Sequence, residues 1–179
     1  DLVCFSGDKL LGSCQAGIIV GRKDLVASLR KNPLMRMLRV DKITYFILQE
    51  TLLRYANDET GSIALWEIVG RDAREIERSV TRLVRAVKNP RKKDCIRRVR
   101  VRSTYGGGSL PTREIASAGV CVTVPGMSAD ELYARFIDQE IPVVGYILDD
   151  RFILDLRTVL PDDIPVLAAS IDGILAGGG

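Results

Sequence analysis

The sequence predicts the end of an α/β domain, then a long connecting helix, and finally a small α+β domain with an antiparallel sheet. Three observations predict this order: two short apolar runs near the start, the second bounded by glycines, helical spacing of apolar residues over 40–55, and alternating apolar and charged residues in the second half. The 179 residues allow one domain or two small ones. We place the boundaries at 1–56 and 57–176, with a tail at 177–179.

The first two apolar runs, Leu2–Phe5 and Ala16–Gly21, have the composition of neighbouring, buried central strands. The polar segment Ser6–Lys9 follows the first run, so a functional loop is expected between the strands. The chain starts at Asp1, without methionine and next to an apolar run. We therefore expect a fragment of a longer protein.

Helical spacing dominates the next part of the chain. Asp24–Lys31 carries apolar residues at helical intervals and is stopped by Asn32 and Pro33. Asparagine before proline also suits the first positions of a new helix beginning at Pro33. Apolar residues then recur at helical spacing over Val40–Tyr55, which predicts one long amphipathic helix.

The second half begins with a helix and a strand. Asp72–Glu75 has the spacing of a capping box, and the helix it starts should end near Asn89 and Pro90. Valine alternates with arginine over 98–102, as in a half-buried strand, and Val120–Val124 repeats the alternation.

Three more elements complete the small domain. Ser128 and Glu131 form a capping box that starts a helix, and Ile164–Leu175 has the pattern of a last helix. The runs Val143–Leu148 and Arg151–Leu156 flank two aspartates and predict a hairpin. The sequence thus predicts an antiparallel sheet with helices on one face.

Composition excludes several kinds of site. The chain has no histidine, so it cannot hold a Ser-His-Asp triad, a histidine base or a histidine-ligated metal. Its four cysteines form no Cys-x-x-Cys pair, which argues against a zinc ribbon or a dense disulfide framework. The apolar runs are too short to cross a bilayer. A reducing cytoplasm is the simplest location.

Lys9 is the most informative residue for chemistry. It follows a predicted strand in a Ser-x-x-Lys spacing with Ser6. A lysine at the mouth of a sheet can form a Schiff base with a carbonyl group, and Ser6 can donate to a phosphate. The spacing alone favours a surface lysine that extends into water.

Longer motifs around Lys9 resemble the cofactor-lysine segment of bacterial selenocysteine synthases, the L-seryl-tRNA(Sec) selenium transferases. The resemblance runs through Asp1–Gly12 and Gln15–Gly21 and continues through Asn32–Lys42 and Tyr105–Pro111. Ser13-Cys14 stands where the family pattern has Gly-Pro. The three separated motifs occur in the order expected for the carboxyl-terminal part of that family.

The resemblance implies the end of a fold-type I large domain that binds pyridoxal 5'-phosphate (PLP), with Lys9 joined to the cofactor. It implies conversion of seryl-tRNA(Sec) to selenocysteinyl-tRNA(Sec) with selenophosphate, through an aminoacrylate. Freed Lys9 is the natural proton shuttle. Asp8 either positions the lysine or is a solvated loop carboxylate. The resemblance also implies a homo-oligomer with shared sites, in which the chain alone is inactive.

Arg36 and Arg39 lie three positions apart after the Asn-Pro sequence. On one helix, both guanidinium groups would project from the same face and suit a tetrahedral anion. In the resembling family these positions are similar to the arginines that bind selenophosphate. Without the resemblance, the spacing favours ion pairs with Asp41, Glu50 or carboxylates of the expected upstream part of the protein.

Positive charge gathers in Lys88–Arg102, which holds eight Lys and Arg residues against Asp94. Such a segment can attract tRNA phosphates, but from sequence we favour a solvated loop and the outer face of a strand, the usual meaning of a charge run. The glycines of Gly106–Ser109 predict a turn, and the resemblance implies that it approaches the active site. Cys14 is interpreted as a small packing residue.

Two other functions remain open from the sequence. The first is a PLP-dependent lyase acting on a free amino acid or an amino sugar phosphate, since the Lys9 motif would look the same. The second is a non-catalytic domain that interacts with RNA, in which Lys9 has lost its role.

Overall fold

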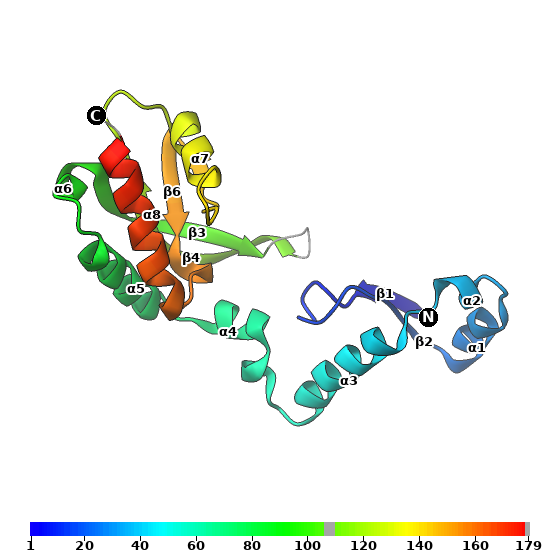
Figure 1. Cartoon of the computed structure of the whole chain (residues 1–179). Coiled ribbons are helices and arrows are strands. Elements are labelled where there is room, and N and C mark those ends of the chain that lie inside the picture. Colours follow the sequence, from blue (N-terminus) through cyan, green and yellow to red (C-terminus); the bar gives the residue numbers. More distant parts are fainter. Residues whose placement is uncertain (106–109, 178–179) are drawn as a thin grey trace. The chain divides into compact units, whose positions relative to one another are not determined.

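The computed structural model describes residues 1–105 and 110–177, with the backbone alone for 110–113. The chain folds as two compact units, Asp1–Gly70 (unit 1) and Arg71–Gly179 (unit 2), and Figure 1 shows the elements of each. The two units divide after Gly70. The domain boundary expected after residue 56 concerns the complete protein and stays a prediction.

Unit 1 begins with two paired strands, β1 (Leu2–Ser6) and β2 (Gly17–Gly21). They run antiparallel, with Leu2 opposite Gly21 and Ser6 opposite Gly17. The prediction that these segments are neighbouring strands is therefore confirmed. The prediction that they are buried is wrong for this chain, because the pair forms a sheet of only two strands and Val3 is 59% exposed.

Helices make up the rest of unit 1: α1 (Lys23–Lys31), α2 (Met35–Leu38), α3 (Lys42–Ala56), the 3₁₀ turn Thr60–Ser62 and α4 (Ala64–Gly70). The Asp41 side chain caps α3 by accepting a hydrogen bond from the Thr44 amide. The long helix is thus confirmed. A helix starting at Pro33 is not: the Asn32 side chain accepts from the Leu34 amide, and α2 begins only at Met35.

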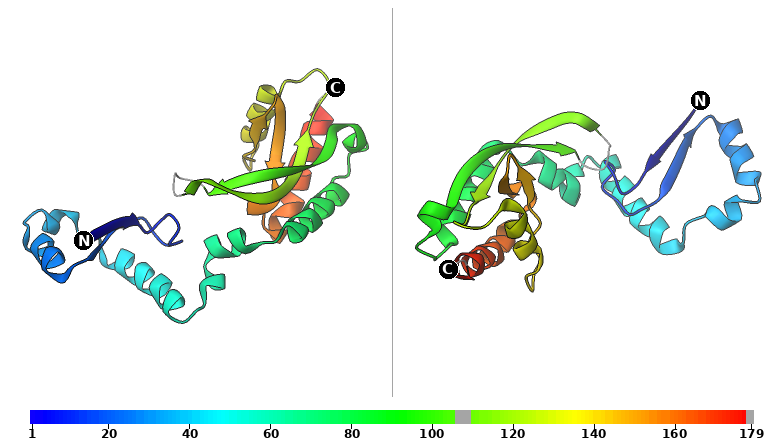
Figure 2. Two further views of the ribbon diagram at one scale, coloured as in Figure 1. Left: turned by 180° about the vertical axis from the view of Figure 1, so that it is seen from behind. Right: turned by 90° about the horizontal axis from the view of Figure 1, so that it is seen from above.

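Unit 2 is built on one antiparallel sheet of four strands, β3 (Ile96–Tyr105), β4 (Leu110–Val122), β6 (Arg151–Asp155) and β5 (Tyr146–Leu148), in that spatial order. β6 pairs with β4 only along Gly119–Val122. The remaining length of β3 and β4 therefore forms a two-stranded arm that projects beyond the sheet (Figures 1 and 2).

The helices of unit 2 are α5 (Ala73–Ala86), α6 (Lys92–Cys95), α7 (Ala129–Ile137) and α8 (Ile164–Gly177), with 3₁₀ turns at Leu156–Thr158 and Pro161–Asp163. Ser128 and Glu131 form the complete capping box predicted for α7. At α5 the Asp72 side chain accepts from the Glu75 amide as predicted. The Glu75 carboxylate, however, turns to Arg71.

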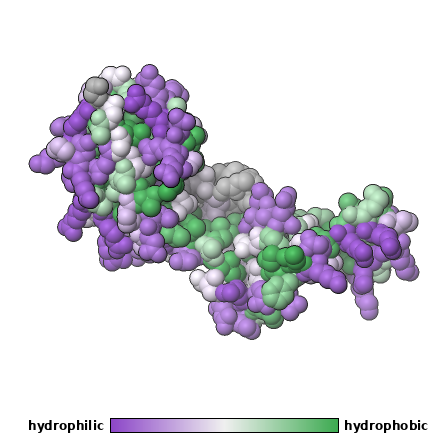
Figure 3. Space-filling model, in the orientation of Figure 1, coloured by the Kyte–Doolittle hydropathy of each residue, from purple (hydrophilic) through white to green (hydrophobic). Residues whose placement is uncertain are grey.

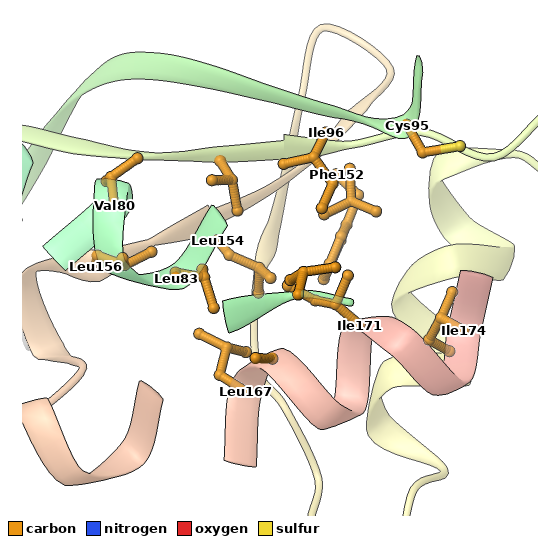
Figure 4. Close-up of a cluster of buried hydrophobic side chains, with 14 of the residues drawn as sticks. Val80, Leu83, Cys95, Ile96, Phe152, Leu154, Leu156, Leu167, Ile171 and Ile174 are labelled. Atoms are coloured by element: carbon orange, nitrogen blue, oxygen red, sulfur yellow. The ribbon is translucent and has the colours of Figure 1, made fainter. Parts of the chain in front are cut away.

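The core of unit 2 lies between the sheet and three of its helices. Phe152 and Leu154 of β6 lie in one buried cluster with Leu83 of α5 and Ile171 of α8 (Figure 4). The ring of Phe136 on α7 stacks on Phe152 with centroids 4.8 Å apart. Helices on one face of an antiparallel sheet are what the sequence predicted. Gly177, expected in the tail, is the last residue of α8.

Within the described ranges, no helix is long and apolar enough to cross a membrane. The four cysteines are free thiols, two of them buried in unit 2. No group of acidic, cysteine or histidine side chains in those ranges could hold a metal ion.

Candidate active site around Lys9

The segment between β1 and β2 is a tight loop closed by its own backbone. The Gly7 amide donates to the Ala16 carbonyl at 2.8 Å, and the Ser13 amide donates to the Gly7 carbonyl at 2.9 Å. Lys9 lies in a turn closed by the Gly12 amide, which donates to the Lys9 carbonyl at 2.9 Å. The loop therefore has a definite shape around the lysine.

Glycine is required at two positions of this loop. Gly12 adopts φ +71°, a conformation that residues with a side chain rarely adopt. A Cβ atom at Gly7 would lie 2.5 Å from the Cys14 carbonyl oxygen. A side chain at either position would therefore change the shape of the loop.

Helix α3 holds the loop from one side through polar contacts. The Ser13 and Thr51 hydroxyls are hydrogen-bonded at 2.9 Å, and the Cys14 thiol lies 3.7 Å from the Thr44 carbonyl. The two residues that depart from the family's Gly-Pro pattern thus both contact α3. Cys14, predicted to be a packing residue, is partly buried there.

An aromatic pair holds the loop at its other end. The Tyr55 hydroxyl donates to the Leu11 carbonyl at 3.0 Å, and the Trp66 indole donates to the Tyr55 oxygen at 2.5 Å. This chain of hydrogen bonds joins α4, α3 and the loop. Sequence analysis missed it, although a tyrosine at the end of an apolar helix carries a hydroxyl that needs a partner once it is partly buried.

Ser6, Asp8 and Lys9 are brought together at the start of the loop. The Ser6 hydroxyl donates to one oxygen of the Asp8 carboxylate, and the Lys9 ammonium lies 3.8 Å from the other. The hydrogen bond from Ser6 is the main cause of a lowered pKa for Asp8, and the charge of Lys9 adds to it. The Lys9 side chain is 48% exposed, so its amine is open to a reactant.

Arg36 and Arg39 do not share a helix. Arg36 lies in α2, whereas Arg39 follows the last residue of α2 in an extended conformation with φ −66° and ψ 137°. The predicted common helix face is therefore wrong. The chain is extended at Arg39 and again at Asp41, which caps α3.

Both of these guanidinium groups are nevertheless available to an anion. Arg36 and Arg39 are exposed, and neither forms an ion pair with any residue that the structure describes. The Asp41 carboxylate, considered above as a partner, binds Thr44 instead. The predicted turn Gly106–Ser109 lies outside the described residues.

Comparison with known proteins identifies the family. The family model of SelA, L-seryl-tRNA selenium transferase, matches residues 1–160. The chain belongs to this family. It is 39% identical to the L-seryl-tRNA(Sec) selenium transferase of Campylobacter concisus over 171 residues, covering 96% of this chain and 36% of the relative. It is also 39% identical to the transferase of the same name from Hyphomonas neptunium, covering 92% of this chain and 36% of that one.

The chain thus spans little more than a third of the length of these two transferases. Among solved structures, D-glucosaminate-6-phosphate ammonia-lyase resembles it with a TM-score of 0.68 over 99% of this chain and 44% of that one. The sequence identity is 20%, so the likeness shows a shared fold. Relatives from Geobacter metallireducens and Aquifex aeolicus, each 36% identical, carry the selenium transferase name as well.

Proposed function

We propose that the complete protein converts seryl-tRNA(Sec) to selenocysteinyl-tRNA(Sec) with selenophosphate as the selenium donor and PLP as the cofactor. The observation that carries this proposal is an exposed lysine amine on a loop of fixed shape, in a chain that belongs to the L-seryl-tRNA selenium transferase family. We also propose that the complete protein is a homo-oligomer. We place it in the cytoplasm, a reducing compartment that agrees with the free cysteines of the chain.

Lys9 fits the cofactor that we propose. A PLP aldehyde needs a primary amine that is accessible yet held in place, and Lys9 is about half exposed on a loop bound to α3. When bound, PLP would supply an electron sink that eases removal of the α-proton and loss of the seryl hydroxyl.

Lys9 is also the residue of this chain best suited to move a proton. The chain has no histidine, and the amine of Lys9 is the basic group in the loop. Asp8 holds its carboxylate 3.8 Å from that amine, so we assign it a positioning role. Asp8 is ionised at neutral pH, and its lowered pKa extends the ionised form to more acidic pH.

The Ser6 hydroxyl already donates a hydrogen bond within the site. The hydroxyl donates to Asp8, which orients the carboxylate toward Lys9. A contact between Ser6 and the cofactor phosphate would require this hydroxyl to rotate away from Asp8. We therefore propose two roles for Ser6. It positions the Asp8 carboxylate, and when its hydroxyl rotates away from Asp8 it donates to the cofactor phosphate.

Arg36 and Arg39 are proposed to bind selenophosphate. Guanidinium groups donate two parallel hydrogen bonds to phosphate oxygens, and these two are exposed without an acidic partner among the described residues. Arg36→Ala and Arg39→Ala in the full-length protein should weaken use of the selenium donor and leave cofactor absorption unchanged. Arg30→Ala, on α1, is the matched control. Unchanged dependence on donor concentration in single-turnover assays would contradict the assignment.

Chemical trapping tests the proposal for Lys9. Full-length protein reduced with borohydride and digested should carry a pyridoxyl group on the peptide that contains Lys9. Lys9→Ala should abolish both this adduct and the yellow absorption, whereas Lys42→Ala at the start of α3 should keep them. An adduct on another peptide, or a colourless protein, would overturn the enzymatic proposal.

Substrate assays separate the proposal from a lyase. Full-length protein is given seryl-tRNA(Sec), free serine or an amino sugar phosphate, each with selenophosphate. We expect selenium to enter the tRNA-linked product alone. Turnover of a free small molecule with no tRNA product would favour the lyase.

A further inference from the structure

Positive charge is concentrated in one stretch of unit 2. Residues 71–105 contain thirteen Lys and Arg residues and four Asp and Glu residues, although the net charge of the whole chain is only +3. The stretch includes α5 and β3, which are joined by side-chain contacts between Arg98 and Thr81 and between Arg100 and Glu77. Such an asymmetry is typical of a surface that binds a polyanion.

Four arginines form a stripe along α5. Arg74, Arg78, Arg82 and Arg85 recur at intervals of four and three residues, so they share one face of the helix. The opposite face carries Ile76, Val80 and Leu83, which are buried in the core. All four arginines are exposed and span about 16 Å along the helix axis at 1.5 Å per residue.

The like charges of this stripe destabilise α5 when no anion is bound. Like charges three or four residues apart on a helix repel each other by a few tenths of a kcal/mol per pair. No acidic side chain pairs with any of the four arginines in the described part of the chain, because Glu75 binds Arg71 and Glu77 binds Arg100. The repulsion would be relieved by an external anion.

β3 extends the positive surface beyond α5. Arg98 donates to the Thr81 hydroxyl at 3.1 Å, and Arg100 lies 3.5 Å from the Glu77 carboxylate, so both project toward the helix. A groove of about 330 Å³ lies between the two elements and is lined by these four residues together with Val80, Val99 and Ala118. Hydrophilic side chains cover much of unit 2 in the space-filling view (Figure 3).

We propose that the α5 stripe, together with Arg98 and Arg100, binds the phosphate backbone of a folded RNA. This inference rests on the proposed function and names the surface that would bind its tRNA substrate. Charges spread over about 16 Å suit several successive phosphates better than one small anion. The stripe holds arginine and no lysine, and arginine matches phosphate with a planar pair of donors.

The composition of the stripe also favours RNA over a lipid surface. A helix that binds membranes places apolar side chains beside its basic ones, whereas the apolar residues of α5 are in the core. The stripe itself contains no aromatic residue on which a base could stack. The surface therefore binds backbone phosphates and RNA shape rather than a base sequence.

Binding assays on the full-length protein test this surface. The ligand is a fluorescently labelled tRNA(Sec) transcript, and anisotropy is measured over a series of KCl concentrations. The double variant Arg78→Gln, Arg82→Gln should bind about tenfold more weakly, and the slope of log K against log salt should shrink by about 1 to 2. The double variant Arg135→Gln, Arg151→Gln loses the same charge from exposed positions outside the stripe and should bind as the parent does.

The outcomes distinguish this inference from the proposed function. Unchanged affinity of the stripe variant, or an equal loss in the control, overturns the RNA surface. Stripe-dependent binding to phosphatidylserine vesicles without an effect on tRNA overturns it in favour of a membrane. Trapping of PLP on Lys9 is a separate measurement, so its failure would overturn the enzymatic proposal while leaving the binding result to be judged alone.

Discussion

Arg71 and Arg157 each donate a hydrogen bond to the other's backbone carbonyl. The Arg71 guanidinium lies 2.7 Å from the Arg157 carbonyl oxygen, and the Arg157 guanidinium lies 3.1 Å from that of Arg71. Both residues are buried. Arg71 also donates to the carbonyls of Leu156 and Val159 and pairs with Glu75, so it joins the start of α5 to the turn after β6.

Arg71→Ala should therefore lower the free energy of unfolding of unit 2 by about 3 kcal/mol, because several buried carbonyls would lose their donor. Urea unfolding followed by circular dichroism measures the loss. Trp66, the one tryptophan of the sequence, reports on unit 1, so its fluorescence transition should stay in place. Arg74→Ala, at an exposed neighbouring position, is the control, and an equal shift in both variants would contradict this role.

Tyr55→Phe should loosen the loop that carries Lys9. The change removes the hydroxyl between the Leu11 carbonyl and the Trp66 indole, at a cost of about 1 to 2 kcal/mol in stability. Urea unfolding followed by tryptophan fluorescence should shift to lower concentration, and the native emission should move to longer wavelength. Tyr45→Phe, exposed on the same helix, should change neither. Identical curves for the two variants would show that the hydroxyl does not hold the loop.

Ser6→Ala should raise the pKa of Asp8 toward its ordinary value. The hydrogen bond from Ser6 is the largest cause of the lowered pKa, and it favours the ionised carboxylate. Stabilisation from this bond is present above the pKa of unfolded aspartate and is lost as the pH falls through the folded pKa. A carbon-13 NMR titration of the carboxyl groups measures the shift. Asp24, whose lowered pKa comes mainly from Arg22, should titrate unchanged.

The hairpin turn between β5 and β6 offers a stabilising change. Asp149 and Asp150 have φ of 50° and 56°, the conformation of a type I′ turn, which Asn-Gly adopts more easily. The double variant Asp149→Asn, Asp150→Gly should raise the stability of unit 2 by about 1 kcal/mol. Calorimetry should show a higher Tm. Asp150→Ala should lower it, and the opposite order would contradict the strain argument.

Sequence patterns correctly predicted the elements whose ends are set by residues close to them in the sequence. Ser128 and Glu131 form the capping box that the spacing indicated, and Asp41 caps the long helix just where apolar periodicity begins. The pair of aspartates between two apolar runs became the turn of a hairpin. In each case the determining residues lie within four positions of one another.

Elements that depend on distant contacts were not predicted correctly. Helix α5 ends at Ala86, before the expected Asn89, because the Lys88 and Asn89 amides donate to the Asp172 carboxylate of α8. The short helices α4 and α6 are too brief to show a period. In the candidate site, the Ser6–Lys9 segment was found from sequence. Its support by Tyr55 depends on a contact 44 positions away along the chain.

Gly7 limits how the loop that carries Lys9 can be engineered. Because the Cys14 carbonyl occupies the space that a first side-chain carbon would need, a library randomised over residues 6–12 should return glycine alone at position 7. Moving Lys9 and its loop into another protein would thus require transferring residues 6–16 together with α3, whose side chains hold the loop.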